Sequence, residues 1–177
     1  MILASMLARS LRFAAAFAIP LCAASFVSAA EASDPLADAL EIEGMTFVAE
    51  SGSGHAVVLD ASPDIGGRNL GARPMEMVLM GTGACSAIDV VHILRKARQA
   101  ITGCVVELDA DRAAEDPKVF TRIRFHFVVT GRALAPAQVE RAVRLSKEKY
   151  CSATAMLAKS AEITTDFEIR EGAAPQT

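Results

Sequence analysis

Several familiar functional signatures are missing from this chain, and each absence narrows what it can do. No Cys-x-x-Cys pair occurs, and four cysteines in 177 residues are too few for a scaffold stapled by disulfides. No GxGxxG pattern occurs, and no Lys-Ser or Lys-Thr pair comes directly after the glycine-rich stretch 62–73, so the common phosphate-binding loops are excluded. A formal net charge of −3 provides no basic surface, so we expect no nucleic-acid partner.

Hydrophobic residues are abundant. They make up 52% of the chain, which suffices for one domain with its own core. No stretch, however, reaches the roughly 18 uninterrupted apolar residues, with suitable flanks, of a membrane-spanning helix. The most apolar element beyond the N-terminal segment contains Glu76 and Asp89. We therefore interpret this element as part of a protein core and expect no membrane span.

The first thirty residues have the layout of a secretory signal peptide. Arg9 and Arg12 precede an apolar run over residues 13–27, and small residues at 28–30 offer a cleavage site. This interpretation predicts a periplasmic or exported protein. The alternative is a start codon placed too far upstream, which would leave a cytoplasmic protein. Lipidation is not expected, because the residue before Cys22 is large.

One long helix organises the remaining sequence. Pro74 suits the first position of a helix, where its missing N–H is not needed, and the helical pattern continues to about residue 98. Gly81 and Gly83 each cost about 1 kcal/mol relative to alanine inside a helix, so we expect another element to approach the backbone closely there. Apolar residues occupy nearly every side over residues 77–88, which predicts that this half is buried.

Short apolar or alternating segments separated by turns predict five strands, and apolar residues at helical spacing predict two further helices. The strands are expected at 40–50, with a turn at Glu43-Gly44, and at 55–60, 104–109, 120–129 and 163–169, and the helices at 136–149 and 153–159. The order ββ-α-ββ-α-α-β defines an α+β domain over residues 41–170, with a linker at 31–40 before it and a disordered tail at 171–177 after it. Because so small a chain cannot easily cover its long apolar helix, we expect an intertwined homodimer.

Two cysteines are candidate reactive thiols. Cys151 lies where one helix ends and another begins, and a thiol at a helix N-terminus is acidified because the N–H groups favour the thiolate. Cys85 lies inside the long helix, where burial alone would raise its pKa. This argument makes Cys151 the more acidic thiol. The pattern alone also fits small buried hydrophobes, as most free cysteines are, and we interpret Cys104 as structural.

Two motifs surround the candidate thiols, PMEMVLMGTGAC at 74–85 and EKYCS at 148–152. They resemble motifs of the OsmC/Ohr family of thiol-dependent peroxidases (osmotically inducible and organic hydroperoxide resistance proteins). The sequences GMTFVAESGSGH at 44–55 and CSAIDVV at 85–91 are most similar to the YhfA-like branch. Both motifs occur in the expected order, and the resemblance extends over residues 42–170.

The resemblance implies a function and a mechanism. In this mechanism Cys85 attacks a peroxide as the thiolate and becomes a sulfenic acid, and Cys151 condenses with it to a disulfide. A small dithiol or a lipoylated protein then reduces the disulfide. We follow the family's assignment of the first attack to Cys85. The expectation is an oxidoreductase of the oxidative stress response that needs no cofactor or metal and builds each site from both chains of a homodimer. Apolar lining such as Met77 and Met80 predicts a preference for organic hydroperoxides.

The chain departs from the family at two positions that support the attacking thiolate. Family members hold the thiolate with an arginine from the N-terminal hairpin, which pairs with a glutamate directly after the helix-opening proline. Here the hairpin at 50–60 has no arginine, and His55 is its only potential cation. Met75 follows the proline, and Glu76 comes one residue later. Arg73 is the candidate replacement for the missing arginine.

Four alternatives remain open. Cys85, His92 and Cys151 are candidate zinc ligands, although their spacing matches no standard pattern. Cys85 with His92 is also a candidate nucleophile and base of a hydrolase; otherwise we expect His92 at the edge of the core and His126 exposed on its strand. The third alternative is a non-catalytic dimer of the same fold that binds a small apolar or thiol-bearing ligand. The fourth is an exported redox protein unrelated to peroxide, which requires residues 1–30 to be a genuine signal peptide.

Overall fold

The structure, a computed structural model, describes residues 37–172. The predicted signal segment 1–30 lies outside the described residues. Most of the predicted linker and tail also lie outside them, although residues 37–40 and Glu171 belong to strands. The observed order β-β-β-α-β-β-α-α-β confirms the predicted α+β class and contains one strand more than expected.

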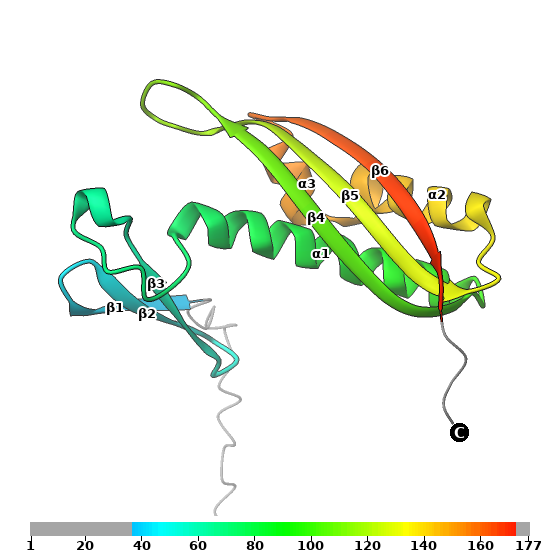
Figure 1. Ribbon diagram of the computed structural model, residues 1–177, viewed down its shortest axis with the longest axis horizontal. Helices are drawn as coiled ribbons and strands as arrows, with labels where there is room; N and C mark the ends of the chain where they lie inside the picture. The colour runs from blue at the N-terminus through cyan, green and yellow to red at the C-terminus, as the bar shows by residue number, and fades with distance from the viewer. Residues whose placement is uncertain (1–36, 173–177) are drawn as a thin grey trace, which may run out of the picture. The chain divides into compact units, whose positions relative to one another are not determined.

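Three strands at the start of the described chain form an antiparallel sheet in the order β1-β2-β3 (Figure 1). They are β1 (Ala37–Glu43), β2 (Thr46–Ser51) and β3 (Ala56–Asp60). Gly44 takes a φ of +63°, which glycine adopts without a Cβ clash, in the turn from β1 to β2. The single strand predicted over 40–50 is therefore wrong, whereas the hairpin formed by β2 and β3 is confirmed.

The buried carboxylate of Asp60 organises the loop from β3 to the long helix. It accepts hydrogen bonds from the backbone N–H groups of Ala61, Arg68 and Leu70 at 2.9, 3.0 and 2.9 Å. The Thr46 hydroxyl donates a further bond of 3.3 Å. These donors favour the charged form, and the pKa of Asp60 is lowered, chiefly by the bond from Leu70. The loop is thus tied back to the end of β3.

Helix α1 (Pro74–Lys96) begins at the predicted proline, after a short 3-10 turn at Pro63–Ile65. The Glu76 side chain accepts a hydrogen bond of 2.9 Å from the backbone N–H of Arg73, which satisfies one free donor at the helix N-terminus. Arg95 and Lys96 lie in the last turn, where positive charge is favourable.

Only one face of α1 is buried. Its buried residues are Thr82, Gly83, Ser86, Val90 and Leu94. Large apolar side chains elsewhere on the helix are exposed: Val78 at 43%, Met80 at 56% and Ile88 at 69%. The prediction of burial on every side over 77–88 is therefore wrong for the single chain, because the packed elements cover one side of the helix.

The two glycines of α1 have different surroundings. A Cβ on Gly83 would lie 2.6 Å from Cδ1 of Leu108 on the neighbouring sheet, so the close approach expected there is confirmed. A Cβ on Gly81 would meet nothing within 4 Å. Contacts within the single chain therefore explain Gly83 but not Gly81.

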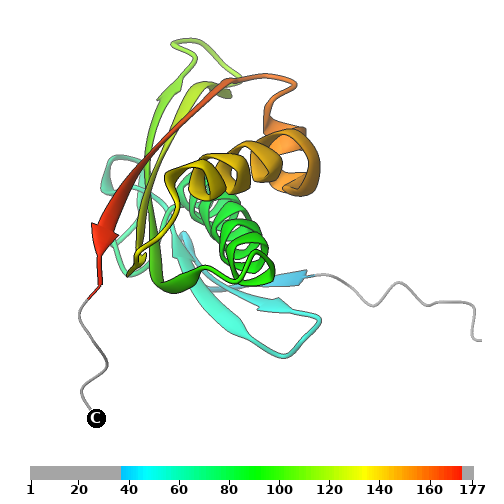
Figure 2. The same ribbon diagram turned by 90° about the vertical axis from the view of Figure 1, so that its right-hand side faces the viewer.

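Strands β4 (Ala100–Arg112), β5 (Phe120–Arg132) and β6 (Glu162–Glu171) form the second sheet, with β5 in the centre. β4 and β5 are antiparallel, whereas β5 and β6 are parallel. Parallel strands need a crossover connection, which here contains α2 (Pro136–Leu145) and α3 (Ser152–Leu157). The helices lie on one face of this sheet (Figure 2).

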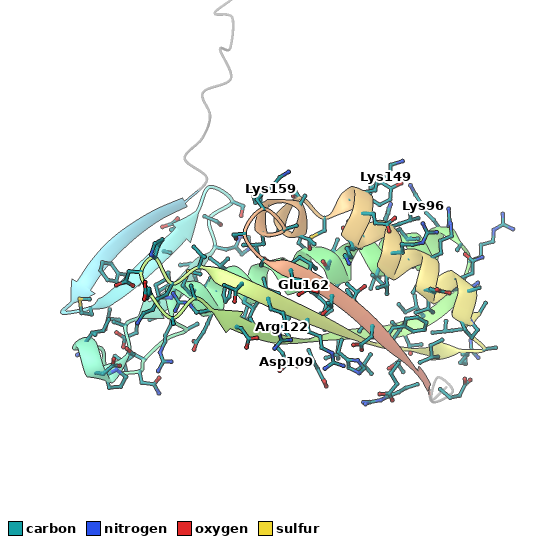
Figure 3. The ribbon with its side chains drawn as sticks, turned by 90° about the horizontal axis from the view of Figure 1, so that it is seen from above. Lys96, Asp109, Arg122, Lys149, Lys159 and Glu162 are labelled. Carbon is teal, nitrogen blue, oxygen red and sulfur yellow. The ribbon has the colours of Figure 1, made fainter. Side chains whose placement is uncertain are left out.

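β5 alternates as the sequence predicts. Its inward side chains form the core together with residues of α1 and α2: Ile123, Phe125, Phe127, Val129, Leu94 and Val139. On the other face Arg122 pairs with Asp111 at 2.7 Å, and Arg124 pairs with Asp166 at 2.8 Å. Figure 3 shows Asp109 and Arg122 on the side of the sheet that faces away from the helices.

Candidate functional site

Cys85 and Cys151 are brought together by the packing of α1 against the segment that leads into α3 (Figure 1). Cys85 lies on α1 and is partly exposed. Cys151 is 2% exposed and lies between a π-helical turn, Ser146–Tyr150, and α3. The two thiols lie close enough for each to shift the pKa of the other, and both are free. The structure therefore places side by side the two thiols on which the sequence interpretation depends.

The sulfur of Cys151 accepts two hydrogen bonds from a single residue. Cys151 is the N-cap of α3, and Thr154 donates its backbone N–H over 3.4 Å and its hydroxyl over 3.1 Å to Sγ. The oxygen of this hydroxyl also lies 3.2 Å from the Ser86 hydroxyl on α1. Ser86 and Thr154 are 3% and 2% exposed, so water competes little for these bonds.

Cys85 has a different environment. The backbone N–H of Ala153 in α3 lies near its sulfur and favours the thiolate. The carboxylate of Asp89, about one turn further along α1, lies close enough for its charge to disfavour the Cys85 thiolate. Ser146 donates its hydroxyl to Asp89 over 3.1 Å, which helps to hold the carboxylate in place.

These contacts move the pKa values of the two thiols in opposite directions. Burial raises the pKa of Cys85, and the interactions with Cys151 and Asp89 also raise it. Burial acts in the same direction on Cys151, but the neighbouring hydroxyls of Ser86 and Thr154, the Thr154 N–H and the Cys85 thiol together outweigh it and lower its pKa. The thiols titrate as a pair, with the negative charge favoured on Cys151. This agrees with the helix-terminus argument made from the sequence.

Arg73, Glu76 and His55 are not brought to the sulfurs within one chain. Arg73 and Glu76 lie 3.6 Å apart at the start of α1, and about 14 Å of helix separates Glu76 from Cys85. His55 is exposed in the turn between β2 and β3, where its Nδ1 lies 3.1 Å from the Ser53 hydroxyl. Support for a Cys85 thiolate by these three residues would therefore need a second chain.

Two histidines lie in settings that differ from the predicted ones. His92 is exposed on α1 rather than packed at the edge of the core. His126 is partly buried on β5, because it bonds to Asp166 across the sheet, rather than exposed. Within residues 37–172 no three His, Cys, Asp or Glu side chains are grouped so that they could hold a metal ion. The arrangement therefore gives no support to the zinc alternative.

Sequence reasoning missed the groups that surround the two sulfurs. Asp89 could have been identified from the sequence, because a spacing of four residues places Asp89 and Cys85 on the same helix face. Thr154 follows Cys151 by three positions, which is the spacing between an N-cap and the N–H that it accepts. The contact between Ser86 and Thr154 depends on how α1 packs against α3 and leaves no local signal.

A cavity of about 340 Å³ opens near the start of α1. Arg73 and Arg112 line it together with apolar side chains that include Met45, Phe47 and Met75. Neither of the two sulfurs lines this cavity. Its apolar surface suits a small organic molecule, but a second chain would be needed to bring it to a thiol.

The chain is similar in sequence to known proteins. A family model described as OsmC-like protein matches residues 66–166. Protein YhfA of Escherichia coli (strain K12) is 50% identical over 128 residues, which are 72% of this chain and 92% of YhfA.

Solved structures show the same fold. A structural-genomics structure is 46% identical, with a TM-score of 0.70, over 77% of this chain and 98% of the solved one. OsmC of Legionella pneumophila, described as an organic hydroperoxide resistance protein and predicted redox protein, is 17% identical, with a TM-score of 0.58. That likeness covers 75% of this chain and 96% of the Legionella chain and shows the fold alone.

Proposed function

Because this chain belongs to the OsmC-like family, we propose that it is a thiol-dependent peroxidase that reduces organic hydroperoxides through Cys85 and Cys151. The observation that carries the proposal is the packing of α1 against the segment that leads into α3, which brings these two thiols from distant parts of the chain close enough to shift each other's pKa. Neighbouring thiols can form a disulfide with little movement of the backbone.

The proposed cycle has three steps. The Cys85 thiolate attacks the hydroperoxide, so that an S–O bond forms, the O–O bond breaks and the alkoxide leaves with a proton as an alcohol. The Cys151 thiolate then attacks the sulfenic sulfur of Cys85, and hydroxide leaves and is protonated to water. A small dithiol or a lipoylated protein reduces the disulfide by exchange and is itself oxidised.

We include a homodimer in the proposal, because the exposed side of α1 has the properties of an interface. Met80 and Ile88 are 56% and 69% exposed. Together with Gly81 and Ala84 they fall within an arc of about 100° around the helix. The helix-weakening Gly81, which contacts within the chain do not explain, would allow a second backbone to approach this side. A second chain is also what Arg73, Glu76 or His55 would need to act on a thiol.

Organic hydroperoxides are the proposed substrates for two reasons. The cavity near the start of α1 and the exposed side of α1 are largely apolar, so they favour a peroxide that carries a hydrocarbon group over hydrogen peroxide. The Legionella pneumophila protein of the same fold is described as an organic hydroperoxide resistance protein.

A second candidate function is a non-catalytic dimer that binds a small apolar or thiol-bearing ligand. The hairpin at 50–60 contains no arginine, and this favours the second candidate, because the residue that supports the attacking thiolate in the resemblance is missing. The 340 Å³ cavity is large enough for a small ligand. Such a protein would retain a ligand and leave hydroperoxide unconsumed.

Consumption of cumene hydroperoxide with dithiothreitol as the reductant tests the proposal. We expect turnover by the wild type, a rate at the buffer background for Cys85→Ser and, when dithiothreitol is left out, a single turnover for Cys151→Ser that leaves a sulfenic acid trapped by dimedone. Cys104→Ser is the matched control, because Cys104 lies on β4 outside the site, and it should retain the wild-type rate. Equal rates for wild type and Cys85→Ser would refute the assignment, and a retained ligand without turnover would favour the second candidate.

A further inference from the structure

The buried hydroxyls beside Cys151 have no role in the cycle described so far. Thr154 places its backbone N–H and its hydroxyl on the Cys151 sulfur, at 3.4 and 3.1 Å, and its hydroxyl oxygen lies 3.2 Å from that of Ser86. Because the Thr154 hydrogen is directed at the sulfur, Ser86 is the donor in the second bond. A chain of two hydroxyl donors that ends on a sulfur stabilises negative charge on that sulfur.

A neighbouring residue on α1 shows that this arrangement is not the usual one for a helix hydroxyl. Serine and threonine inside a helix commonly donate to a carbonyl of the preceding turn, and Thr82 does so, over 2.7 Å to the Val78 carbonyl. Ser86, one turn later, makes its bond to Thr154 across the interface between α1 and α3. The hydroxyl is therefore directed at the site rather than at its own helix.

Access and charge stabilisation are divided between the two thiols. Cys151 is 2% exposed, whereas Cys85 is partly exposed and is the thiol that a peroxide can reach. The Asp89 carboxylate lies close to Cys85 on the same helix. Lys149, two residues before Cys151, is exposed on the helical side (Figure 3), with its ammonium 5.4 Å from the centre of the Tyr150 ring. The groups in contact with the sulfurs thus favour charge on the less accessible thiol.

We propose that Thr154, supported by Ser86, holds Cys151 as the thiolate of the resting pair, and that this thiolate accepts the proton of Cys85 as Cys85 attacks the hydroperoxide. Thr154 and Ser86 are then positioning residues that act through Cys151. Cys151 is the base of the first step as well as the resolving thiol of the second. The inference rests on the proposed peroxidase function. In it, Cys151 and its two hydroxyl neighbours substitute for the arginine that the hairpin lacks. The opposite pKa shifts of the two thiols support it.

Protons and electrons balance in this scheme. The resting pair carries one proton, on Cys85, and that proton moves to Cys151 as the S–O bond forms and the O–O bond breaks. Cys151 passes the proton to the leaving alkoxide, so that the alcohol departs neutral and Cys151 is again a thiolate. This thiolate attacks the sulfenic sulfur of Cys85, the disulfide forms, and hydroxide leaves and takes a proton from solvent.

Two measurements on Thr154→Val test the inference. The first is the rate at which one equivalent of cumene hydroperoxide oxidises Cys85, and it should fall about 10- to 100-fold at pH 7. The second is the pH midpoint of the ultraviolet thiolate absorbance of Cys151 in a Cys85→Ser background, and it should rise by about one to two units. Thr154→Ser, which keeps the hydroxyl, should restore both values. Thr130→Val on β5 is the matched control and should change neither.

An unchanged rate and an unchanged midpoint in Thr154→Val would overturn the inference. If that variant does not fold, Cys151→Ala gives the same information: a base predicts slower first oxidation of Cys85 than in the wild type, whereas a thiol that only resolves leaves that rate unchanged. The titration needs no hydroperoxide, so the two proposals can fail separately. A wild type that consumes no hydroperoxide but shows a Thr154-dependent midpoint rejects the peroxidase function and retains the assignment of the thiolate.

Discussion

The tendency of each of the two sulfurs to ionise is governed by the groups close to it. Cys151 accepts hydrogen bonds from the N–H and the hydroxyl of Thr154, whereas the Ala153 N–H and the Asp89 carboxylate act in opposite directions on Cys85. The atoms are chemically identical, so their different tendency to ionise comes from these neighbours. Changing one neighbour should therefore move one thiol in a direction that can be stated in advance.

Asp89→Asn is expected to make Cys85 more acidic. The carboxylate raises the pKa of Cys85 by repelling its thiolate, so a neutral amide removes this effect and lowers the pKa by up to about one unit. Below the wild-type pKa more Cys85 is then ionised and iodoacetamide labels it faster, whereas well above that pKa the rates converge. Labelling rates against pH in a Cys151→Ser background measure the shift. Asp109→Asn on the outer face of the sheet is the control, and equal midpoints in the two variants would contradict the argument.

At the scale of elements, the loop between β3 and α1 depends on Asp60, and Asp60→Asn should destabilise the protein. The variant loses a carboxylate that accepts four hydrogen bonds, and at pH 7 its melting temperature should be several degrees lower than that of the wild type. Folding lowers the pKa of Asp60 below its usual value of 3.8. The stabilisation is therefore fully present above that value and is lost as the pH falls through the folded-state pKa.

Thermal unfolding of both proteins from pH 7 down to pH 3 checks this expectation. The difference in melting temperature should be constant near neutral pH and should shrink on acidification, because the protonated wild-type side chain no longer carries the charge. Asp109→Asn, which changes an exposed aspartate on β4, serves as the control and should cost much less. A difference in melting temperature between Asp60→Asn and the wild type that grows on acidification would contradict the expectation.

Elements with a strong local pattern could be predicted from the sequence. The alternation at 120–129 located β5, and Pro136 located the start of α2. β4 extends from Ala100 to Arg112, beyond its alternating segment, because its pairing with β5 continues on both sides. Such an extension depends on a partner strand that is distant in sequence. The turn at Gly44 was noted but was not taken as the boundary between two strands.

The candidate site could likewise be predicted from the sequence only in part. Its two cysteines could be found from motifs that surround each one in the sequence, and a helix-terminus argument identified the more acidic thiol. The hydroxyl of Ser86 could not be assigned to the site, because its partner Thr154 reaches it only through the packing of α1 against α3. Burial of α1 on all sides was predicted from composition, which cannot distinguish a face covered by the same chain from one covered by another.

At the scale of the whole molecule, α1 has an apolar side that the single chain leaves exposed. It is the one helix among the described residues that is long and apolar enough to cross a membrane by length and composition. Helices of a protein core pass the same test, and α1 packs one face against β4 and α2. A second copy of the chain on the remaining side would cover Met80 and Ile88, as the proposed homodimer requires.

Ile88→Lys should therefore shift the protein from dimer to monomer. A lysine at the centre of an apolar interface would bury a charge without a partner, which is costly. Val105→Lys is a matched control, because Val105 on β4 is 59% exposed against 69% for Ile88 but lies on a different element. Molar mass from light scattering after size-exclusion chromatography distinguishes the outcomes. A monomeric wild type, or an Ile88→Lys variant that stays dimeric, would contradict this interface.

The central claim is that Cys85 and Cys151 form a disulfide when the protein meets an organic hydroperoxide. The most direct measurement is peptide mapping by mass spectrometry of the reduced wild-type protein after treatment with one equivalent of cumene hydroperoxide. We expect that two titratable thiols are lost and one molecule of alcohol is released per chain. We also expect a crosslinked peptide pair that contains Cys85 and Cys151. Treated protein in which both thiols remain free, or in which Cys104 is the residue that becomes linked, would contradict it.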